Sequence, residues 1–269
     1  MTGTAKGTIL RLLADLGEAC SAFHDRTVRN IPAKRLQADE IWSFCHAKAR
    51  NLPAHLEGKS GLGDLWTWVA LDADTKLAIS YLVGQRDSGE ATVFMRDLVS
   101  RLDGRAQLTT DGFPGYLQAV ETAFGWNGVD YAMLIKLYGS VSGGSQADHG
   151  YSPPRCTGTM KQWVMGKPKK ADISTSFVER QNLTMRMQMR RFTRLTNAFS
   201  KKAENHAHAV SVHFLHYNFC RVHQTLTKKA KGIHQTPAMA AGLTDRVWTV
   251  ADIVALLDTA TRTNLYNSN

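Results

Sequence analysis

Residues 174–202 read STSFVERQNLTMRMQMRRFTRLTNAFSKK. The stretch lacks Gly and Pro and is rich in Leu, Met, Arg and Gln, so it predicts a long helix from about residue 177 to residue 202. Ser174, Thr175 and Ser176 are candidate N-caps for this helix. Ser176 also stands at capping-box spacing from Glu179.

Glu179 is the only acid in the stretch, and a run of basic residues follows it. The basic residues are Arg180, Arg186, Arg190, Arg191, Arg194, Lys201 and Lys202. At about 100° per residue, Glu179 shares a helix face with Asn182, Leu183, Arg186 and Arg190. One acid at the head of a basic helix suggests metal-assisted chemistry on a phosphate polymer. The alternative is a capping glutamate on a solvated basic helix.

Composition favours a polyanionic partner. The 269 residues are 43% hydrophobic, enough for one domain with appendages. Lys and Arg number 33 against 23 acids, and the net charge of +10 indicates nucleic acid first and an anionic membrane surface second. Four cysteines without a CxxC indicate neither a zinc ribbon nor a disulfide framework. No segment approaches the ~20 apolar residues of a membrane span, so we expect a cytoplasmic protein.

Upstream of the basic helix, the pattern is that of an α/β fold. Apolar spacing predicts a helix over residues 8–30, and residues 35–44 predict a strand that contains Asp39. Because side chains alternate along a strand, Glu40 is expected on the opposite face, so that at most one of these two acids serves a given site. The elements that follow are a strand hairpin at 65–84, a helix at 88–104, a short strand from residue 106 that breaks at Asp111–Gly112, a helix at 116–125 and a strand at 129–139.

Three further acids in these elements stand at turns or strand ends. Asp72 and Asp74 lie between the two strands of the hairpin and are interpreted as turn formers. Asp111 ends a strand before Gly112, where an aspartate is either a turn residue or a site ligand.

The segment at residues 139–173 is rich in Gly, Pro and Ser and is expected to be a long loop. Its Lys161, Lys167, Lys169 and Lys170, with Trp163, suit phosphate contact and base stacking, and an inert insertion is the alternative. Residues 204–226 predict a further helix. There His213 and His216 have metal-ligand spacing but lack a completing ligand, so core or DNA-contact roles are preferred.

Asp39, Asp111 and Glu179 stand out by their positions in this order of elements. If the first and fourth strands are neighbours and the basic helix packs beside them, the three carboxylates converge. Hard oxygen ligands of this kind hold Mg²⁺ or Mn²⁺. Two such ions activate an attacking hydroxyl and stabilise the leaving oxygen of an in-line displacement.

The segments QADEIWSF, WTWVALDADTK, LTTDGFPGY, ISTSFVERQNLTMRMQMRRFTRLTNAFSKK and HYNFCRVHQTL resemble the insertion-sequence-one family of bacterial DDE transposases. The similarity runs from about residue 19 to residue 257. It implies an α/β, ribonuclease-H-like fold with a mixed five-stranded sheet flanked by helices, and helical extensions at both ends. It also implies that Asp39, Asp111 and Glu179 are the catalytic, metal-binding acids, with two Mg²⁺ or Mn²⁺ ions. Family members cleave DNA and join its 3′-hydroxyl ends to target DNA.

The resemblance also implies an organisation of the chain. Residues 1–33 are expected to be a helical remnant of a DNA-binding region, 34–227 the catalytic core and 228–269 a helical extension. Relatives usually carry a zinc-binding segment and a helix-turn-helix that this chain lacks or keeps only in part, so either a naturally truncated element or a catalytic fragment is expected. The partner is double-stranded DNA, bound by at least a dimer. Residues expected to contact DNA are Arg180, Asn182, Arg186, Arg190, Arg191, Arg194, Arg221 and His223.

Two alternatives use the same residues differently. A ribonuclease-H-like nuclease would cleave DNA without joining it. A non-catalytic DNA-binding derivative that regulates transposition would be indifferent to Asp39→Asn.

Overall fold

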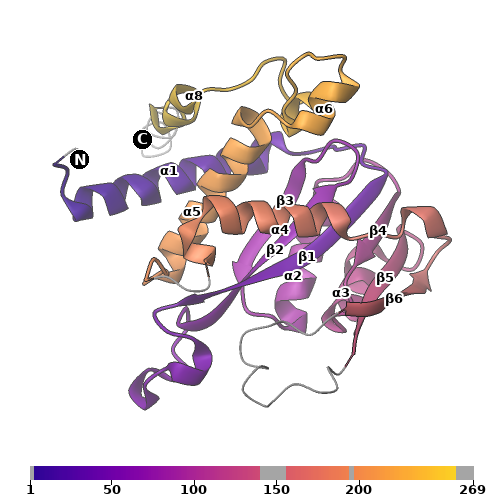
Figure 1. Ribbon diagram of the computed structural model, residues 1–269, viewed down its shortest axis with the longest axis horizontal. Helices are drawn as coiled ribbons and strands as arrows, with labels where there is room; N and C mark the ends of the chain where they lie inside the picture. The colour runs from indigo at the N-terminus through magenta and orange to yellow at the C-terminus, as the bar shows by residue number, and fades with distance from the viewer. Residues whose placement is uncertain (1–2, 140–155, 194–196, 259–269) are drawn as a thin grey trace, which may run out of the picture.

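A computed structural model describes residues 3–139, 156–193 and 197–258. The chain forms an α/β fold around a six-stranded mixed sheet of order β3-β2-β1-β4-β5-β6 (Figure 1). β1 lies parallel to β4 and β4 parallel to β5, and the other three pairings are antiparallel. The strands are β1 Arg35–Cys45, β2 Gly63–Asp72, β3 Ala78–Gly84, β4 Ala106–Thr110, β5 Val129–Tyr138 and β6 Cys156–Met165.

Helices cover both faces of the sheet (Figure 1). They are α1 Lys6–Thr27, α2 Ser88–Ser100, α3 Gly115–Phe124, α4 Ser176–Gln188, α5 Ala203–Leu215, α6 Gln224–Lys229, α7 Pro237–Ala240 and α8 Val250–Val254. A π-helical turn, His216–Cys220, extends α5. Buried residues of α2 and α3 pack on one face of the sheet, and those of α4 and α5 pack on the other. None of the helices in the described ranges is long and apolar enough to cross a membrane.

The predicted order of strands and helices is confirmed through β5, including the adjacency of β1 and β4. Asp72 is confirmed as a turn former, since its carboxylate accepts the backbone N–H groups of Asp74 and Thr75. Asp74, in the same turn, forms an ion pair with Arg35.

The prediction of five strands was wrong, because the expected loop at residues 139–173 contains β6. This strand pairs antiparallel with β5 at the edge of the sheet. Nearly all of its residues are exposed, including Trp163. A strand without a buried face has no alternation of apolar and polar residues to reveal it. Residues 140–155 of the expected loop lie outside the described residues.

The basic helix is also shorter than predicted. α4 ends at Gln188, Met189 is extended, and a 3₁₀ turn follows at Arg190–Phe192. Phe192 is buried in the cluster that contains Ile41 of β1 and Val210 of α5. Burying this ring requires the chain to leave the helix axis, and this packing overrides the helical propensity of the residues that follow.

The N-terminus of α4 is capped by a residue from another element. The N-cap position is Thr175, whose side chain makes no cap hydrogen bond, so the capping box of Ser176 and Glu179 does not form. Instead, Gln37 Oε1 of β1 accepts the N–H groups of Phe177 and Val178 at 2.8 and 3.1 Å. These N–H groups lack partners within the helix, so the glutamine ties α4 to the centre of the sheet.

The chain ends pack on the same core. On α1, the ring of Phe23 lies 5.5 Å from that of Phe219 and 5.0 Å from that of Trp248. Ala238 of α7 and Ile253 of α8 are buried in the cluster that holds α2 and α3. Residues far apart in sequence therefore pack together in one core cluster.

Candidate metal centre

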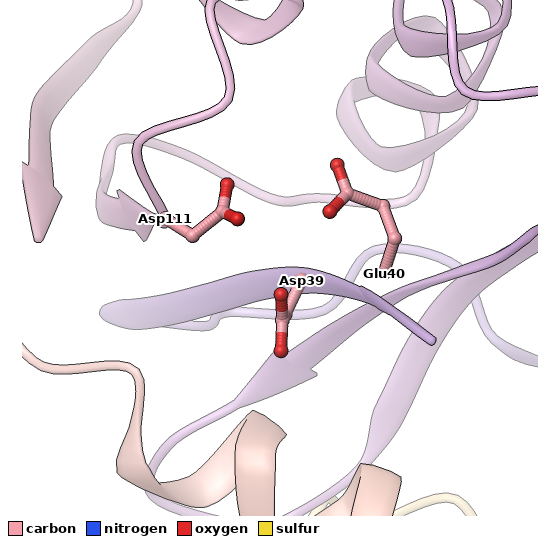
Figure 2. Close-up of side chains that lie close together, drawn as sticks. All are labelled: Asp39, Glu40 and Asp111. Atoms are coloured by element: carbon pink, nitrogen blue, oxygen red, sulfur yellow. The ribbon is translucent and has the colours of Figure 1, made fainter. Parts of the chain in front are cut away.

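Three carboxylates meet where β4 ends. One oxygen each of Asp39, Glu40 and Asp111 lies within 4.8 Å of the others (Figure 2), and we call these residues the acidic cluster. The last residue pair between β1 and β4 is Ala38 with Thr110. Beyond that pair β1 has no neighbour on this side, so the carboxylates approach one another across its free edge.

Glu40 was predicted to lie on the face of β1 opposite Asp39, so that at most one of the two acids serves a given site. The opposite faces are confirmed, yet the carboxylates of both residues reach the acidic cluster. The side chains do alternate: Asp39 extends to one side of β1 and Glu40 to the other, where it faces Asp111 (Figure 2). However, no β4 backbone separates the two sides here, because the ladder has ended. Alternation along β1 therefore sets the direction of each side chain without separating the carboxylates.

Asp111 takes the turn role that its sequence context allowed, and its carboxylate also faces the acidic cluster. Its Oδ1 accepts the N–H of Phe113 at 3.0 Å, which stabilises the turn between β4 and α3. Its Oδ2 lies 3.5 Å from Nη2 of Arg86. The turn thus holds the carboxylate at the carboxyl end of β4, beside the middle of its parallel neighbour β1.

Arg86 is a residue of the site that sequence reasoning missed. Its Nη2 lies 3.5 Å from both Glu40 Oε2 and Asp111 Oδ2. Its guanidinium carbon lies 4.2 Å from the centre of the Phe113 ring and 4.9 Å from that of Trp66. The two rings fix the cation beside the carboxylates. Arg86 stands between β3 and α2, where no spacing rule marks it.

Glu179 comes close to the acidic cluster but does not belong to it. Its Oε1 lies 2.8 Å from Nζ of Lys136 on β5 and accepts the hydroxyl of Thr175. One helical turn further along α4, Nδ2 of Asn182 donates to Asp39 Oδ2 at 2.9 Å. The structure therefore brings Asp39 and Asp111 together and places Glu179 on the adjoining face of α4, paired with a lysine.

Burial and like charge raise the pKa values of two members of the cluster. Burial, followed by the charge of Asp111, raises the pKa of Asp39 to about 7, and Glu179 adds to the rise. The same two causes raise the pKa of Glu40 to about 8, although Arg86 opposes them. Glu40 Oε1 is also buried with no hydrogen-bond partner in the described part of the chain. The cluster therefore favours an added positive charge, either a proton or a cation.

The cluster offers the kind of ligand that a small divalent cation prefers. Mg²⁺ takes oxygen ligands at about 2.0–2.1 Å in octahedral geometry, so neighbouring ligands stand about 3 Å apart and opposite ones about 4 Å apart. The three carboxylate oxygens lie within 4.8 Å of one another, so the side chains would have to draw closer to hold such an ion. A cation would also supply the partner that Glu40 Oε1 lacks.

The residues expected to contact DNA occupy different environments. Asn182 is held by Asp39, and its Oδ1 is buried without a partner in the described chain. Arg191 donates to Ser200 Oγ at 3.0 Å and is partly buried, while Arg190 is exposed. Arg191 therefore fixes the chain after α4 instead of presenting a free cation.

The other predicted DNA contacts divide into two groups. Arg180, Arg221 and His223 line one cavity of about 320 Å³ on another side of α4. Arg186 is partly exposed near the end of α4, and Arg194 lies outside the described residues. Three of the predicted DNA contacts, Arg180, Arg221 and His223, therefore lie together in one cavity.

One residue that sequence reasoning missed, Gln37, has a signal in the sequence. It is a polar residue two positions before Asp39 in an apolar strand, so both face α4, and Gln37 caps that helix. Lys136 has no such signal, because β5 is exposed near its carboxyl end.

No protein-family model matches this chain, and no curated protein matches it.

Proposed function

We propose that this protein is a DDE transposase with a ribonuclease-H-like catalytic core. It cleaves DNA strands and joins the 3′-hydroxyl ends to target DNA in a metal-dependent reaction. One observation carries the proposal: Asp39 and Asp111 were predicted from sequence to converge, and their carboxylate oxygens lie within 4.8 Å of each other, Asp39 within β1 and Asp111 just after the end of its parallel neighbour β4. The basic helix that follows β6 lies beside them and contacts Asp39 through Asn182.

The arrangement of the sheet supports the same proposal. Five of its strands follow the predicted order, and β1, which carries Asp39, is the central parallel neighbour of β4. Ligands of open α/β sheets commonly bind beyond the carboxyl ends of parallel strands. The acidic cluster lies beyond the carboxyl end of β4, beside the part of β1 that continues past it.

Under this proposal, the carboxylates hold a divalent metal that acts on the scissile phosphate. Bound Mg²⁺ or Mn²⁺ would polarise the scissile phosphate and lower the pKa of an attacking water or hydroxyl. Asp39 and Asp111 would hold the metal, and either Glu40 or Glu179 would complete the set. Asn182 fixes the orientation of Asp39. Arg86 and Lys136 offset part of the negative charge while the carboxylates lack a metal.

Double-stranded DNA is the substrate under this proposal. At least two chains would act together, because two DNA ends are joined in one reaction. The formal charge of +10 favours association with DNA in the cytoplasm of a bacterium.

The deciding experiment is a cleavage and joining assay with Mn²⁺. A plasmid that carries the coding sequence with its natural flanking DNA supplies the ends, and a pre-nicked duplex with a free 3′-hydroxyl tests joining directly. We expect wild type to nick and join, and Asp39→Asn and Asp111→Asn to lose at least about a hundredfold in rate, as when a group central to transition-state stabilisation is removed. Asp103→Asn, at an exposed aspartate, is the matched control.

Each outcome has a defined meaning. Nicking without joined product would indicate a nuclease. DNA binding that is unchanged by Asp39→Asn, with no cleavage by wild type, would indicate a non-catalytic regulator. Glu40→Gln and Glu179→Gln identify the third acid, since the variant that loses activity marks the residue required.

A further inference from the structure

A second polar site lies on another side of α4. A cavity of about 320 Å³ opens between α4, the turn that joins β2 to β3, and the segment after the π-helical turn. This volume is at the lower end of the range for small-ligand pockets, about 300–1,000 Å³. Its lining includes Lys76, Arg180, Arg221 and His223, and none of the residues that line it is acidic. We call it the basic pocket.

Two groups of the basic pocket lack partners. Arg221 Nη1 and His223 Nδ1 are both buried, with no hydrogen-bond partner among the residues that the structure describes. A buried guanidinium N–H that donates to nothing is unfavourable, because it has lost water without gaining an acceptor. A ligand that brings acceptor oxygens would satisfy it.

Lys76 forms another part of the pocket. Its ammonium lies 3.0 Å from the centre of the Phe177 ring and donates to the carbonyl of Ala73. The hydroxyl of Tyr217 donates to the carbonyl of Lys76 at 3.0 Å, which anchors the turn. Burial lowers the pKa of Lys76 to about 8, so the ammonium is still mostly charged at pH 7. The pocket therefore presents fixed positive charge.

The basic pocket and the acidic cluster are served by adjacent faces of one helix. Glu179 and Asn182 turn toward Asp39 and Lys136, whereas Arg180 and Thr184 turn toward the pocket. A helix with its side chains is about 10–12 Å across. That width corresponds to roughly three nucleotides of a strand that rises about 3.4 Å per nucleotide.

We propose that the basic pocket binds a single phosphate group, supplied by the backbone of the DNA strand that the acidic cluster processes. The inference rests on the proposed function for its source of phosphate. The guanidinium of Arg221 and the ammonium of Lys76 supply charge, and an arginine fork matches the geometry of phosphate oxygens. The contact positions the strand a few nucleotides from the reacting phosphate and reads no sequence.

The test measures binding in chelator, so that it does not depend on cleavage. The affinity of the full chain for a 30-base-pair duplex is measured across a series of salt concentrations for wild type, Arg221→Gln and Arg96→Gln. Arg96 is exposed on α2, on the opposite face of the sheet, and provides the same change of charge. A second arm measures thermal stabilisation by inorganic phosphate.

We expect Arg221→Gln to weaken duplex binding several-fold and to reduce the slope of log affinity against log salt by about 0.9, the value for one phosphate contact. Arg96→Gln should change neither quantity as much. Thr225→Glu, which places a carboxylate at the exposed rim of the pocket, should reproduce the loss, and Thr225→Gln should not. These rim variants keep the test decisive if Arg221→Gln fails to fold.

Two results would overturn the inference. If duplex affinity is unchanged in Arg221→Gln and Thr225→Glu while stabilisation by inorganic phosphate is lost, the pocket takes a free phosphate and not the DNA backbone. If neither probe responds to these variants, the pocket is not a phosphate site. Loss of strand cleavage in Asp39→Asn with normal binding here would be a separate result, which concerns the acidic cluster alone.

Discussion

Replacing Asp39 by Asn should stabilise the protein at alkaline pH when no metal is bound. The carboxylate of Asp39 has its pKa raised to about 7 by burial and by the charge of Asp111. An unfolded aspartate titrates near 3.9. The folded state therefore holds this proton more tightly, and the associated stability is lost as the pH rises from about 4 through about 7. Asn keeps an oxygen that accepts from Asn182 without the charge.

The magnitude follows from the shift. About three pKa units correspond to about 4 kcal/mol at most. Because Asp39 retains some exposed surface, solvent screening reduces this value, and we expect Asp39→Asn to gain about 2 kcal/mol at pH 8. At pH 4 the gain should be close to zero, since the wild-type carboxyl is then protonated in the folded protein.

The assay is urea unfolding in chelator at several pH values, with the variant compared directly with wild type. The comparison is necessary because three buried histidines make the protein less stable at low pH, which opposes the loss of stability with rising pH caused by Asp39. Burial lowers the pKa values of His24, His206 and His213 to about 4. Because of these histidines, the free energy of unfolding decreases as the pH falls below about 6.5, and by the same amount in both proteins. The effect therefore cancels when the free energies of the two proteins are subtracted.

Asp103→Asn is the control and should change the free energy of unfolding by less than about 0.5 kcal/mol at every pH. Adding Mn²⁺ at pH 8 should then stabilise wild type, by about 2.7 kcal/mol at a hundredfold excess over Kd, and the Asp39 variant much less. A variant that is no more stable than wild type at pH 8, or equally stabilised at pH 5 and pH 8, would refute the electrostatic argument.

Three further outcomes are expected. Gln37→Met should cost about 2 kcal/mol in urea unfolding, because the N–H groups of Phe177 and Val178 lose their acceptor; a cost below about 0.5 kcal/mol would show that water replaces it. Phe192→Ala should cost about 3–5 kcal/mol and Arg190→Ala almost nothing, and similar values for the two would contradict the assigned end of α4. Counted by electron paramagnetic resonance, Mn²⁺ should bind once per free chain and twice per DNA-bound chain.

Much of the fold was predictable because local patterns decide it. The apolar residues of 35–44 marked β1, and turn chemistry at Asp72 marked the hairpin that follows. The convergence of Asp39 and Asp111 needed only that β1 and β4 be parallel neighbours. These features depend on residues close in sequence or on one pairing of strands.

The features that were missed depend on tertiary structure. Glu40 joins the site because β4 stops at Thr110, and no spacing within β1 reveals where a different strand ends. Arg86 joins it because the rings of Trp66 and Phe113 hold its guanidinium there. Both contacts unite residues that lie far apart in the sequence.

Under the proposed function, charge balance would couple metal binding at the acidic cluster to DNA binding. The acidic cluster with Glu179 carries four carboxylates, and two cations, Arg86 and Lys136, lie against them. When all six groups are ionised, the four carboxylates and two cations leave a net charge of −2. One divalent ion neutralises this charge. A second ion would leave an excess of positive charge at a partly buried site unless an anion accompanies it. A DNA phosphate is such an anion, so metal and DNA should each raise the affinity of the other by the same factor.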